Sequence, residues 1–157
     1  IDKESIVLEA GSGSGFLTIN LARFVKKVYS YEIKESFFEL VKRNLERLDI
    51  KNVVLKNQDI YEGIDEDNLD LIVLDLLEPW KCLKFIEKSL KKGKYFIAYL
   101  PNLTQVDRLV KESKNYELYY EKTTELIQRD WIIEDLKLKP SHGNLGHPAF
   151  LAFFRRI

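Results

Sequence analysis

The segment Ile6 to Thr18 constrains the fold more than any other, because three alternate glycines join an apolar run to a helical pattern. Before the glycines, Ile6 to Ala10 is apolar and β-branched apart from Glu9, as in a buried strand. After the glycines, apolar residues recur at the helical positions Leu17, Leu21, Ala22 and Val25. Glycine lets the backbone approach a ligand closely, and a helix start offers unpaired N–H groups. The segment therefore predicts a strand, a tight turn and a helix that form a nucleotide-binding corner.

The spacing of the glycines narrows the choice of nucleotide. A dinucleotide-binding G-x-G-x-x-G pattern from Gly11 needs a glycine where Phe16 stands, and a P-loop needs a lysine that does not follow this turn. What remains is Glu9-x-Gly11-x-Gly13-x-Gly15, with an acidic residue just before the glycines. That arrangement suits a ligand with a cationic amino-acid end better than a pyrophosphate. S-adenosylmethionine is such a ligand.

Composition sets the broad class. With 157 residues, 45% of them hydrophobic, the chain can build one domain with a full core, and we expect a single domain over residues 1–157. Lys and Arg number 25, as do Asp and Glu, so a polyanion must meet a local basic patch. Cys82 has no cysteine to pair with, and no run fits a membrane span or signal sequence, which favours the cytoplasm. Because the chain begins at Ile1 and lacks methionine, we expect it to be a segment of a longer protein.

Strands and helices alternate along the first two thirds of the chain. After the glycine corner we expect strands over 28–33, 52–57, 69–75 and 95–100, and helices over 35–48, 79–90 and 103–113. The strand Leu69 to Asp75 is nearly all apolar and should be central. This alternation predicts an α/β fold with a doubly wound parallel sheet. The aromatic stretch Tyr116 to Leu138, a turn region from Pro140 to Pro148 and a closing strand over 149–154 predict a terminal β-hairpin.

Three acidic residues fall at predicted strand ends, where open α/β sheets bind ligands. Glu32 lies about twenty residues past the glycines, the position from which a carboxylate can bind both ribose hydroxyls, and a solvated glutamate is the alternative. Asp59 can accept a hydrogen bond from an adenine amino group or simply form a turn. Asp75 can act on a substrate, or it can cap the helix that Pro79 begins.

Read together, these features and three further motifs resemble one family. The motifs are Leu-Glu-Pro-Trp-Lys shortly after Asp75, Pro-Asn-x-x-Gln from Pro101, and Gly-His-x-Ala-Phe-Leu from Gly146. Over nearly all its residues the chain is similar to the tRNA (adenine-N1) methyltransferases, in the bacterial and archaeal homo-oligomeric form that modifies adenine 58 of the T-loop. Ser12 and Pro148 stand where that family usually has threonine. The N-terminal β-domain of the family, and its tyrosine-containing segment before the first strand, have no counterpart in this sequence.

The resemblance implies a Rossmann-like class I methyltransferase fold, with a mostly parallel seven-stranded sheet and a C-terminal antiparallel β-hairpin. It implies S-adenosylmethionine as methyl donor, S-adenosylhomocysteine as product, tRNA as partner, a homotetramer, and no metal. Asp75 takes the catalytic role. The residues that the resemblance places around the donor are Glu9, Gly11, Ser12, Gly13, Ser14, Gly15, Leu17, Thr18, Glu32, Asp59, Ile60 and Asp75.

The chemistry of adenine N1 gives Asp75 a specific task. N1 already carries an in-plane lone pair, so no base is needed, but the purine becomes cationic as the methyl group arrives. Asp75 can accept a hydrogen bond from the N6 amino group and stabilise that charge. The T-loop buries its adenine, so the base must be extruded and held; Tyr99 and Trp80 are candidates, with core packing as the alternative. Candidate phosphate contacts, each of which also fits a solvated charged face, are Lys81, Lys84, Lys137, Lys139, Arg155 and Arg156.

Other chemistries fit the sequence less well. Adenine-N6 enzymes present Asp/Asn-Pro-Pro-Tyr/Phe, whereas residues 76–78 here are Leu-Leu-Glu. Cys82 shares a helical face with apolar residues, which indicates a core thiol rather than the nucleophile of a cytosine-C5 enzyme. His142 and His147 lack a third metal ligand at a recognisable spacing. Two alternatives remain, a methyltransferase of the protein isoaspartyl type and a non-catalytic, donor-binding and RNA-binding subunit.

Overall fold

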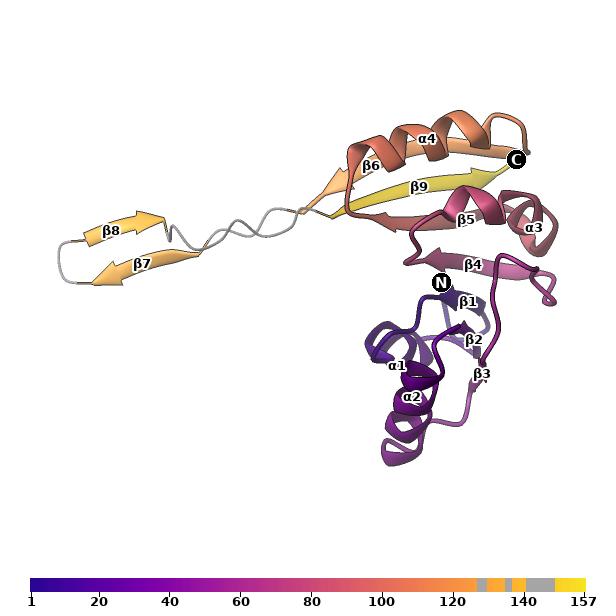
Figure 1. The fold of residues 1–157 in the computed structure, drawn as a ribbon, viewed down its shortest axis with the longest axis horizontal. Helices are drawn as coiled ribbons and strands as arrows, with labels where there is room; N and C mark the ends of the chain where they lie inside the picture. The colour runs from indigo at the N-terminus through magenta and orange to yellow at the C-terminus, as the bar shows by residue number, and fades with distance from the viewer. Residues whose placement is uncertain (127–129, 135–136, 141–148) are drawn as a thin grey trace.

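The structure is a computed structural model that describes residues 1–126, 130–134, 137–140 and 149–157. A seven-stranded sheet carries helices on both faces, and a separate pair of strands lies apart from it (Figure 1). The elements in chain order are β1 (Ile6–Ala10), α1 (Phe16–Ala22), β2 (Lys27–Tyr31), α2 (Glu35–Arg47), β3 (Val53–Lys56), β4 (Leu69–Leu74), the 3-10 helix η1 (Pro79–Cys82), α3 (Leu83–Ser89), β5 (Leu90–Leu100), α4 (Leu103–Ser113), β6 (Leu118–Glu125), β7 (Trp131–Glu134), β8 (Lys137–Pro140) and β9 (Phe150–Arg156).

The strand order of the main sheet is β3-β2-β1-β4-β5-β9-β6. Strands β1 to β5 are parallel, and β9 pairs antiparallel with both β5 and β6. The chain first winds outward from β1 to β3 and then crosses back to β4 on the other side of β1. The carboxyl ends of β1 and β4 therefore meet at the point where the winding reverses, which is where such sheets bind ligands.

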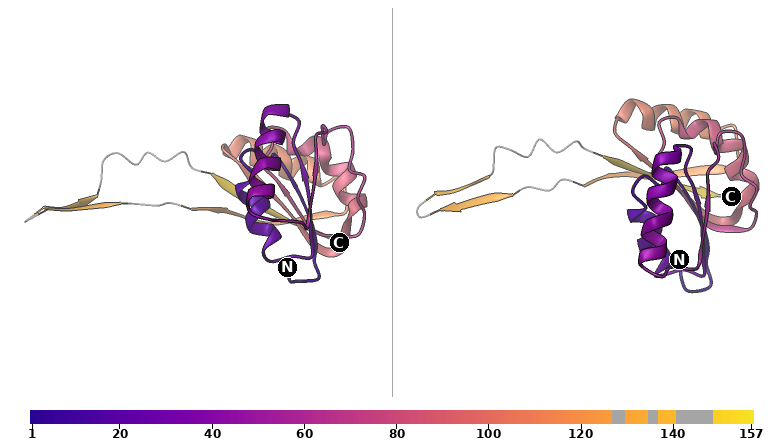
Figure 2. Two further views of the ribbon diagram at one scale, coloured as in Figure 1. Left: turned by 90° about the horizontal axis from the view of Figure 1, so that it is seen from below. Right: turned by 60° about the horizontal axis from the view of Figure 1, so that its bottom comes forward.

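Alternate side chains along the strands supply two separate cores. Leu8 and Ile72 belong to the larger core beneath α3 and α4, in which the rings of Phe96 and Phe154 stack with centroids 5.3 Å apart. Their neighbours Val7 and Leu71 face the other way and pack with Leu21, Ala22 and Val25 of the α1 region. Helices α1 and α2 lie on one face and α3 and α4 on the other (Figure 2). The doubly wound sheet is thus confirmed, and β4 is central as predicted.

The end of the chain confirms the terminal antiparallel pairing and adds an element that the sequence did not predict. β6 and β9 pair from Leu118 with Arg156 to Glu125 with Phe150. Between them in sequence, β7 and β8 form a hairpin of their own, which lies away from the main sheet (Figure 1). The motif residues 146–148 and both histidines, His142 and His147, lie outside the described residues. No described helix is both long and apolar enough to cross a membrane.

Candidate functional site

A cavity of about 470 Å³ opens at the carboxyl ends of β1, β2 and β4. Its volume falls within the range of about 300–1,000 Å³ typical of small-molecule sites. Residues from the glycine turn, from the ends of β2 and β3, and from the segment after β4 line it together. They are Ala10, Gly11, Gly13, Tyr31, Glu32, Ile33, Lys34, Phe37, Gln58, Asp59, Ile60, Tyr61, Asp75, Leu76 and Leu77.

Two of the three glycines in the turn make contacts that a side chain would obstruct. Gly11, Gly13 and Gly15 have φ angles of +90°, +55° and +81°. A Cβ atom on Gly11 would lie 2.2 Å from the carbonyl oxygen of Asp75, and one on Gly15 would lie 3.0 Å from Val41. Gly13 has no such neighbour, since its nearest contact would be 3.9 Å away. The first glycine therefore lets the turn pack directly against the segment that carries Asp75.

Glu32 fixes the glycine turn from the end of β2. Its carboxylate accepts one hydrogen bond from the N–H of Gly13 at 3.0 Å and another from the N–H of Lys34 at 2.9 Å. Asn57 holds the backbone at this point by donating to the Glu32 carbonyl at 2.8 Å. The carboxylate is buried yet lines the cavity, so it is held in one orientation. This is the geometry expected of a group that binds a ribose.

Glu9 has a different environment from the one that the sequence indicated. It is buried below the turn and accepts hydrogen bonds from Thr18 at 2.6 Å and Ser30 at 2.9 Å. Ser12 joins the network through the Ser30 hydroxyl at 2.6 Å. Burial raises the pKa of Glu9. Of the predicted donor-site residues, those outside the cavity lining are Glu9, Ser12, Ser14, Gly15, Leu17 and Thr18. The buried ones support the turn from beneath.

Asp75 lies on the cavity wall directly after β4. Its N–H donates to the carbonyl of Ala10 at 2.9 Å, which continues the pairing of β4 with β1. No side chain or backbone N–H in the described part of the chain donates a hydrogen bond to its carboxylate. The side chain is exposed to the cavity, but the surrounding protein atoms remove part of its hydration and raise its pKa. A helix cap does not explain Asp75, because Glu78 occupies the N-cap position of η1.

Asp59 forms a local turn and also lines the cavity. One carboxylate oxygen accepts the N–H of Tyr61 at 2.9 Å, as in a local turn. The same residue lines the cavity beside the buried Ile60. The turn leaves the second carboxylate oxygen available to a ligand.

Two residues near Asp75 were not singled out as site residues in the sequence. The hydroxyl of Tyr61 accepts the N–H of Glu78 at 3.0 Å, and the amide of Gln105 donates to the carbonyl of Leu77 at 2.9 Å. Both residues are distant from this segment in sequence, so no local pattern marks their role. Gln105 is the last residue of the Pro-Asn-x-x-Gln motif, and this was the only signal for it.

The residues proposed to contact RNA are dispersed. Trp80 is only 9% exposed and its ring lies 4.1 Å beneath the guanidinium of Arg108, so core packing accounts for it. Tyr99 is 42% exposed at the end of β5 and stays a candidate. Arg155 pairs in register with Tyr95, near the opposite edge of the sheet from the cavity. Arg156 follows it there, and Lys139 lies on the separate β7–β8 hairpin.

Lys81 and Lys84 lie in η1 and α3, which follow the Asp75 segment in the chain, and their ammonium groups already have partners in the protein. Lys81 forms an ion pair with Glu78, and Lys84 lies 4.5 Å from the ring centre of Phe85. Cys82 is fully buried, and burial raises its pKa to about 12, as expected for a core thiol. Among the described residues, no group of three His, Cys, Asp or Glu side chains is placed to hold a metal ion.

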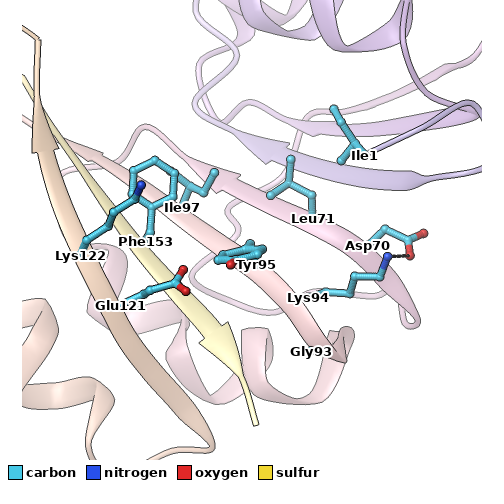
Figure 3. Close-up of a pocket in the computed structure, with 10 residues that line it drawn as sticks. All are labelled: Ile1, Asp70, Leu71, Gly93, Lys94, Tyr95, Ile97, Glu121, Lys122 and Phe153. Atoms are coloured by element: carbon cyan, nitrogen blue, oxygen red, sulfur yellow. Dashed lines mark ion pairs between the residues drawn. The ribbon is translucent and has the colours of Figure 1, made fainter.

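A larger cavity of about 580 Å³ lies on the face of the sheet away from α3 and α4 (Figure 3). Leu71, Ile97 and Phe153 line it, and none of the predicted site residues does. One of its acidic groups, the half-buried Asp70, is already paired with Lys94 at 3.3 Å. The smaller cavity is therefore the candidate functional site, because there a carboxylate with no partner among the described residues meets the glycine turn.

Comparison with known proteins identifies the family of the chain. A family model described as a methyltransferase domain matches residues 1–141. The tRNA (adenine(58)-N(1))-methyltransferase TrmI of Thermus thermophilus is 37% identical over 96% of this chain and 61% of its own length. A tRNA (adenine(57)-N(1)/adenine(58)-N(1))-methyltransferase TrmI of Methanocaldococcus jannaschii is 31% identical, over 95% of this chain and 64% of its own.

A solved structure gives the same result. The tRNA (m1A58) methyltransferase TrmI of Aquifex aeolicus superposes with a TM-score of 0.84 at 28% identity, covering all of this chain and 64% of its own. The chain thus spans about three fifths of the length of the relatives that it matches. The resemblance seen in the sequence is confirmed, as is the class I methyltransferase fold. The chain belongs to the methyltransferase-domain family.

Proposed function

We propose that this chain, a single methyltransferase domain over residues 1–157, transfers a methyl group from S-adenosylmethionine to N1 of adenine 58 in tRNA. The observation that carries this proposal is the position of Asp75. Its carboxylate has no hydrogen-bond donor in the described part of the protein, and it opens into the cavity that Glu32 and the glycine turn form. It is therefore free to bind a group that enters from outside.

The residues around the cavity fit the proposed methyl donor. Glu32 is held so that it can accept the two ribose hydroxyls, and Asp59 has a carboxylate oxygen left for the adenine amino group. Ile33 and Ile60 offer apolar side chains to the faces of a purine. Three carboxylates and one ammonium group, that of Lys34, line the cavity, so its charge suits a cationic ligand better than a pyrophosphate. The bound donor supplies an electrophilic methyl group on a sulfonium.

Asp75 then acts on the substrate base. Because N1 has its own lone pair, the carboxylate need not remove a proton. It accepts a hydrogen bond from the N6 amino group, and this bond strengthens as positive charge spreads over the purine. Removing a single preorganised group of this kind typically costs about 10²–10³ in rate. The hydration that Asp75 has already lost makes the interaction stronger than it would be in water.

We further propose that the protein acts as a homotetramer in the cytoplasm, on the strength of the resemblance. Trp131, Ile133 and Leu138 on the β7–β8 hairpin support self-association, since they are 58%, 75% and 71% exposed. Exposed apolar side chains on an arm away from the main sheet are typical of an interface between subunits.

The test is to incubate the protein with labelled S-adenosylmethionine and an unmodified tRNA transcript, then to digest the RNA and identify the methylated nucleoside by mass spectrometry. A transcript with uridine at position 58 is the matched control. We expect 1-methyladenosine at position 58 only. Methyl transfer to an isoaspartyl peptide, with none to tRNA, would assign the chain to the protein-modifying alternative. Binding of donor and tRNA without any methylated product would indicate the non-catalytic subunit.

A further inference from the structure

The segment after β4 is held by backbone hydrogen bonds to three other elements. Three hydrogen bonds hold it: Asp75 N–H to the Ala10 carbonyl at 2.9 Å, Glu78 N–H to the Tyr61 hydroxyl at 3.0 Å, and the Gln105 amide to the Leu77 carbonyl at 2.9 Å. The three partners come from β1, from the loop after β3 and from α4. The side chains of this segment are thus presented from a backbone that is held from three directions.

Leu77 is the exposed apolar side chain of this segment. It is 73% exposed, although it lines the same cavity as Asp75. A single exposed leucine needs no explanation on its own. Here, however, two more exposed apolar side chains occur at the same edge of the sheet, Tyr99 at the end of β5 and Leu103 at the start of α4, at 42% and 60%. Tyr99 follows Ala98, which pairs with Leu74, and Leu103 lies two residues before Gln105, which binds the Leu77 carbonyl, so both are tied to the segment that carries Asp75.

Gln105 connects two of these apolar positions. It lies two residues after Leu103 in the first turn of α4, and its amide nitrogen binds the backbone of Leu77. Its amide oxygen accepts a hydrogen bond from Asn102 at 3.0 Å, which fixes the orientation of the amide. Gln105 therefore fixes the position of the Leu77 segment relative to the start of α4.

We propose that Leu77 is a substrate-contacting residue that packs against the ring of the target purine, and that Gln105 is the positioning residue that holds it there. This inference rests on the proposed function. A purine has apolar faces and a polar edge, so a base extruded from tRNA needs an apolar surface as well as a hydrogen-bond acceptor. Asp75 supplies the acceptor and Leu77 supplies the surface. The two are two residues apart on one fixed backbone.

The alternative is that Leu77 is covered by protein, either a second copy or a part of the protein outside these residues. The two explanations differ in what a change at Leu77 affects. Contact with the substrate affects the reaction with tRNA, whereas burial in a protein interface affects the oligomeric state or the melting temperature. Both sets of quantities can be measured on the same variants.

The experiment compares Leu77→Ala and Leu77→Met with Leu48→Ala. Leu48 is a matched control because it is also an exposed leucine, at 43%, and lies at the end of α2 outside the cavity lining. For each protein one measures kcat and KM for tRNA at saturating S-adenosylmethionine, the Kd for S-adenosylhomocysteine, the melting temperature and the oligomeric state. We expect Leu77→Ala to lower kcat/KM for tRNA by about tenfold or more, Leu77→Met to recover most of it, and Leu48→Ala to match wild type.

Gln105→Leu tests the positioning role. It keeps the size of the side chain and removes the donor to the Leu77 carbonyl. We expect it to reduce kcat/KM for tRNA in the same way as Leu77→Ala, with the Kd for S-adenosylhomocysteine and the melting temperature unchanged. A purely structural role would instead lower the melting temperature and leave the reaction of the folded protein intact.

The outcomes separate this inference from the function on which it rests. If wild type and Leu48→Ala both fail to methylate tRNA, the proposed function is wrong and the inference is lost with it. If wild type is active and Leu77→Ala has the same kcat/KM, the inference alone is overturned. A change confined to oligomeric state or melting temperature also overturns it, in favour of the protein-interface explanation.

Discussion

Replacing Gly11 by alanine isolates the contact between the glycine turn and Asp75. The new Cβ would lie 2.2 Å from the Asp75 carbonyl oxygen, whereas real Cβ atoms essentially never approach within 3.0 Å. The two segments must therefore separate by roughly 0.8 Å, and a displacement near 1 Å can cost about 10²-fold in rate. Alanine at the φ of +90° adds a conformational cost of about 1–2 kcal/mol.

Gly93→Ala is the control for that conformational cost. Gly93 has a φ of +78°, and a Cβ there would meet nothing within 4 Å. Both variants therefore lose the same backbone freedom, but only Gly11→Ala disturbs Asp75. A destabilisation of 1 kcal/mol lowers the melting temperature of a chain of this size by about 2–4 °C, so Gly93→Ala should melt a few degrees below wild type. Its methylation rate should equal that of wild type.

Gly11→Ala should melt at a lower temperature than Gly93→Ala and lose methylation of tRNA by about 10²-fold. Differential scanning fluorimetry gives the melting temperatures, and a single-turnover assay with tRNA gives the rates. Equal melting temperatures and equal rates for the two variants would refute the close packing of this turn against Asp75.

Two further changes test the acidic residues of the turn. Glu32→Gln removes a charged acceptor and should weaken S-adenosylhomocysteine binding by about tenfold or more. Glu35→Gln, at the exposed start of α2, is the control and should bind as wild type does. Equal Kd values for the two variants, measured by calorimetry, would count against a ribose contact. Burial raises the pKa of Glu9 above its ordinary value of 4.5, so the folded state holds that proton more tightly, and wild-type stability declines as pH rises from 4.5 through the raised pKa. Glu9→Gln lacks this titration, so its melting temperature relative to wild type should rise over the same interval. If the difference in melting temperature between Glu9→Gln and wild type stays constant over this pH interval, the buried environment of Glu9 is contradicted.

The sequence predicted those parts of the site that depend on local order along the chain. Gly11 and Glu32 occupy fixed places relative to one strand–turn–helix unit, and Asp75 follows a strand whose apolar run marks it as central. Once the strand order is known, these positions must converge at one edge of the sheet. The sequence thus predicted which edge of the sheet carries the cavity, but not all of the residues that line it.

The rest depends on contacts between distant residues, which no local pattern encodes. The Glu9 carboxylate accepts a hydrogen bond from the Ser30 hydroxyl of the neighbouring strand, and no pattern in the sequence near Glu9 marks that contact. Tyr61 and Gln105 reach the segment after Asp75 from separate elements. The β7–β8 hairpin was not predicted as a separate element, because β6 and β7 are both rich in strand-forming residues and fall within the one stretch Tyr116 to Leu138.

The most direct test of the central claim is the methylation rate of Asp75→Asn on tRNA at saturating S-adenosylmethionine. The substitution keeps the shape of the side chain and removes its charge. If Asp75 stabilises the cationic purine, the rate falls by about 10²–10³-fold while the Kd for S-adenosylhomocysteine stays close to that of wild type. A rate within about threefold of wild type, with 1-methyladenosine still formed at position 58, would contradict the role assigned to Asp75.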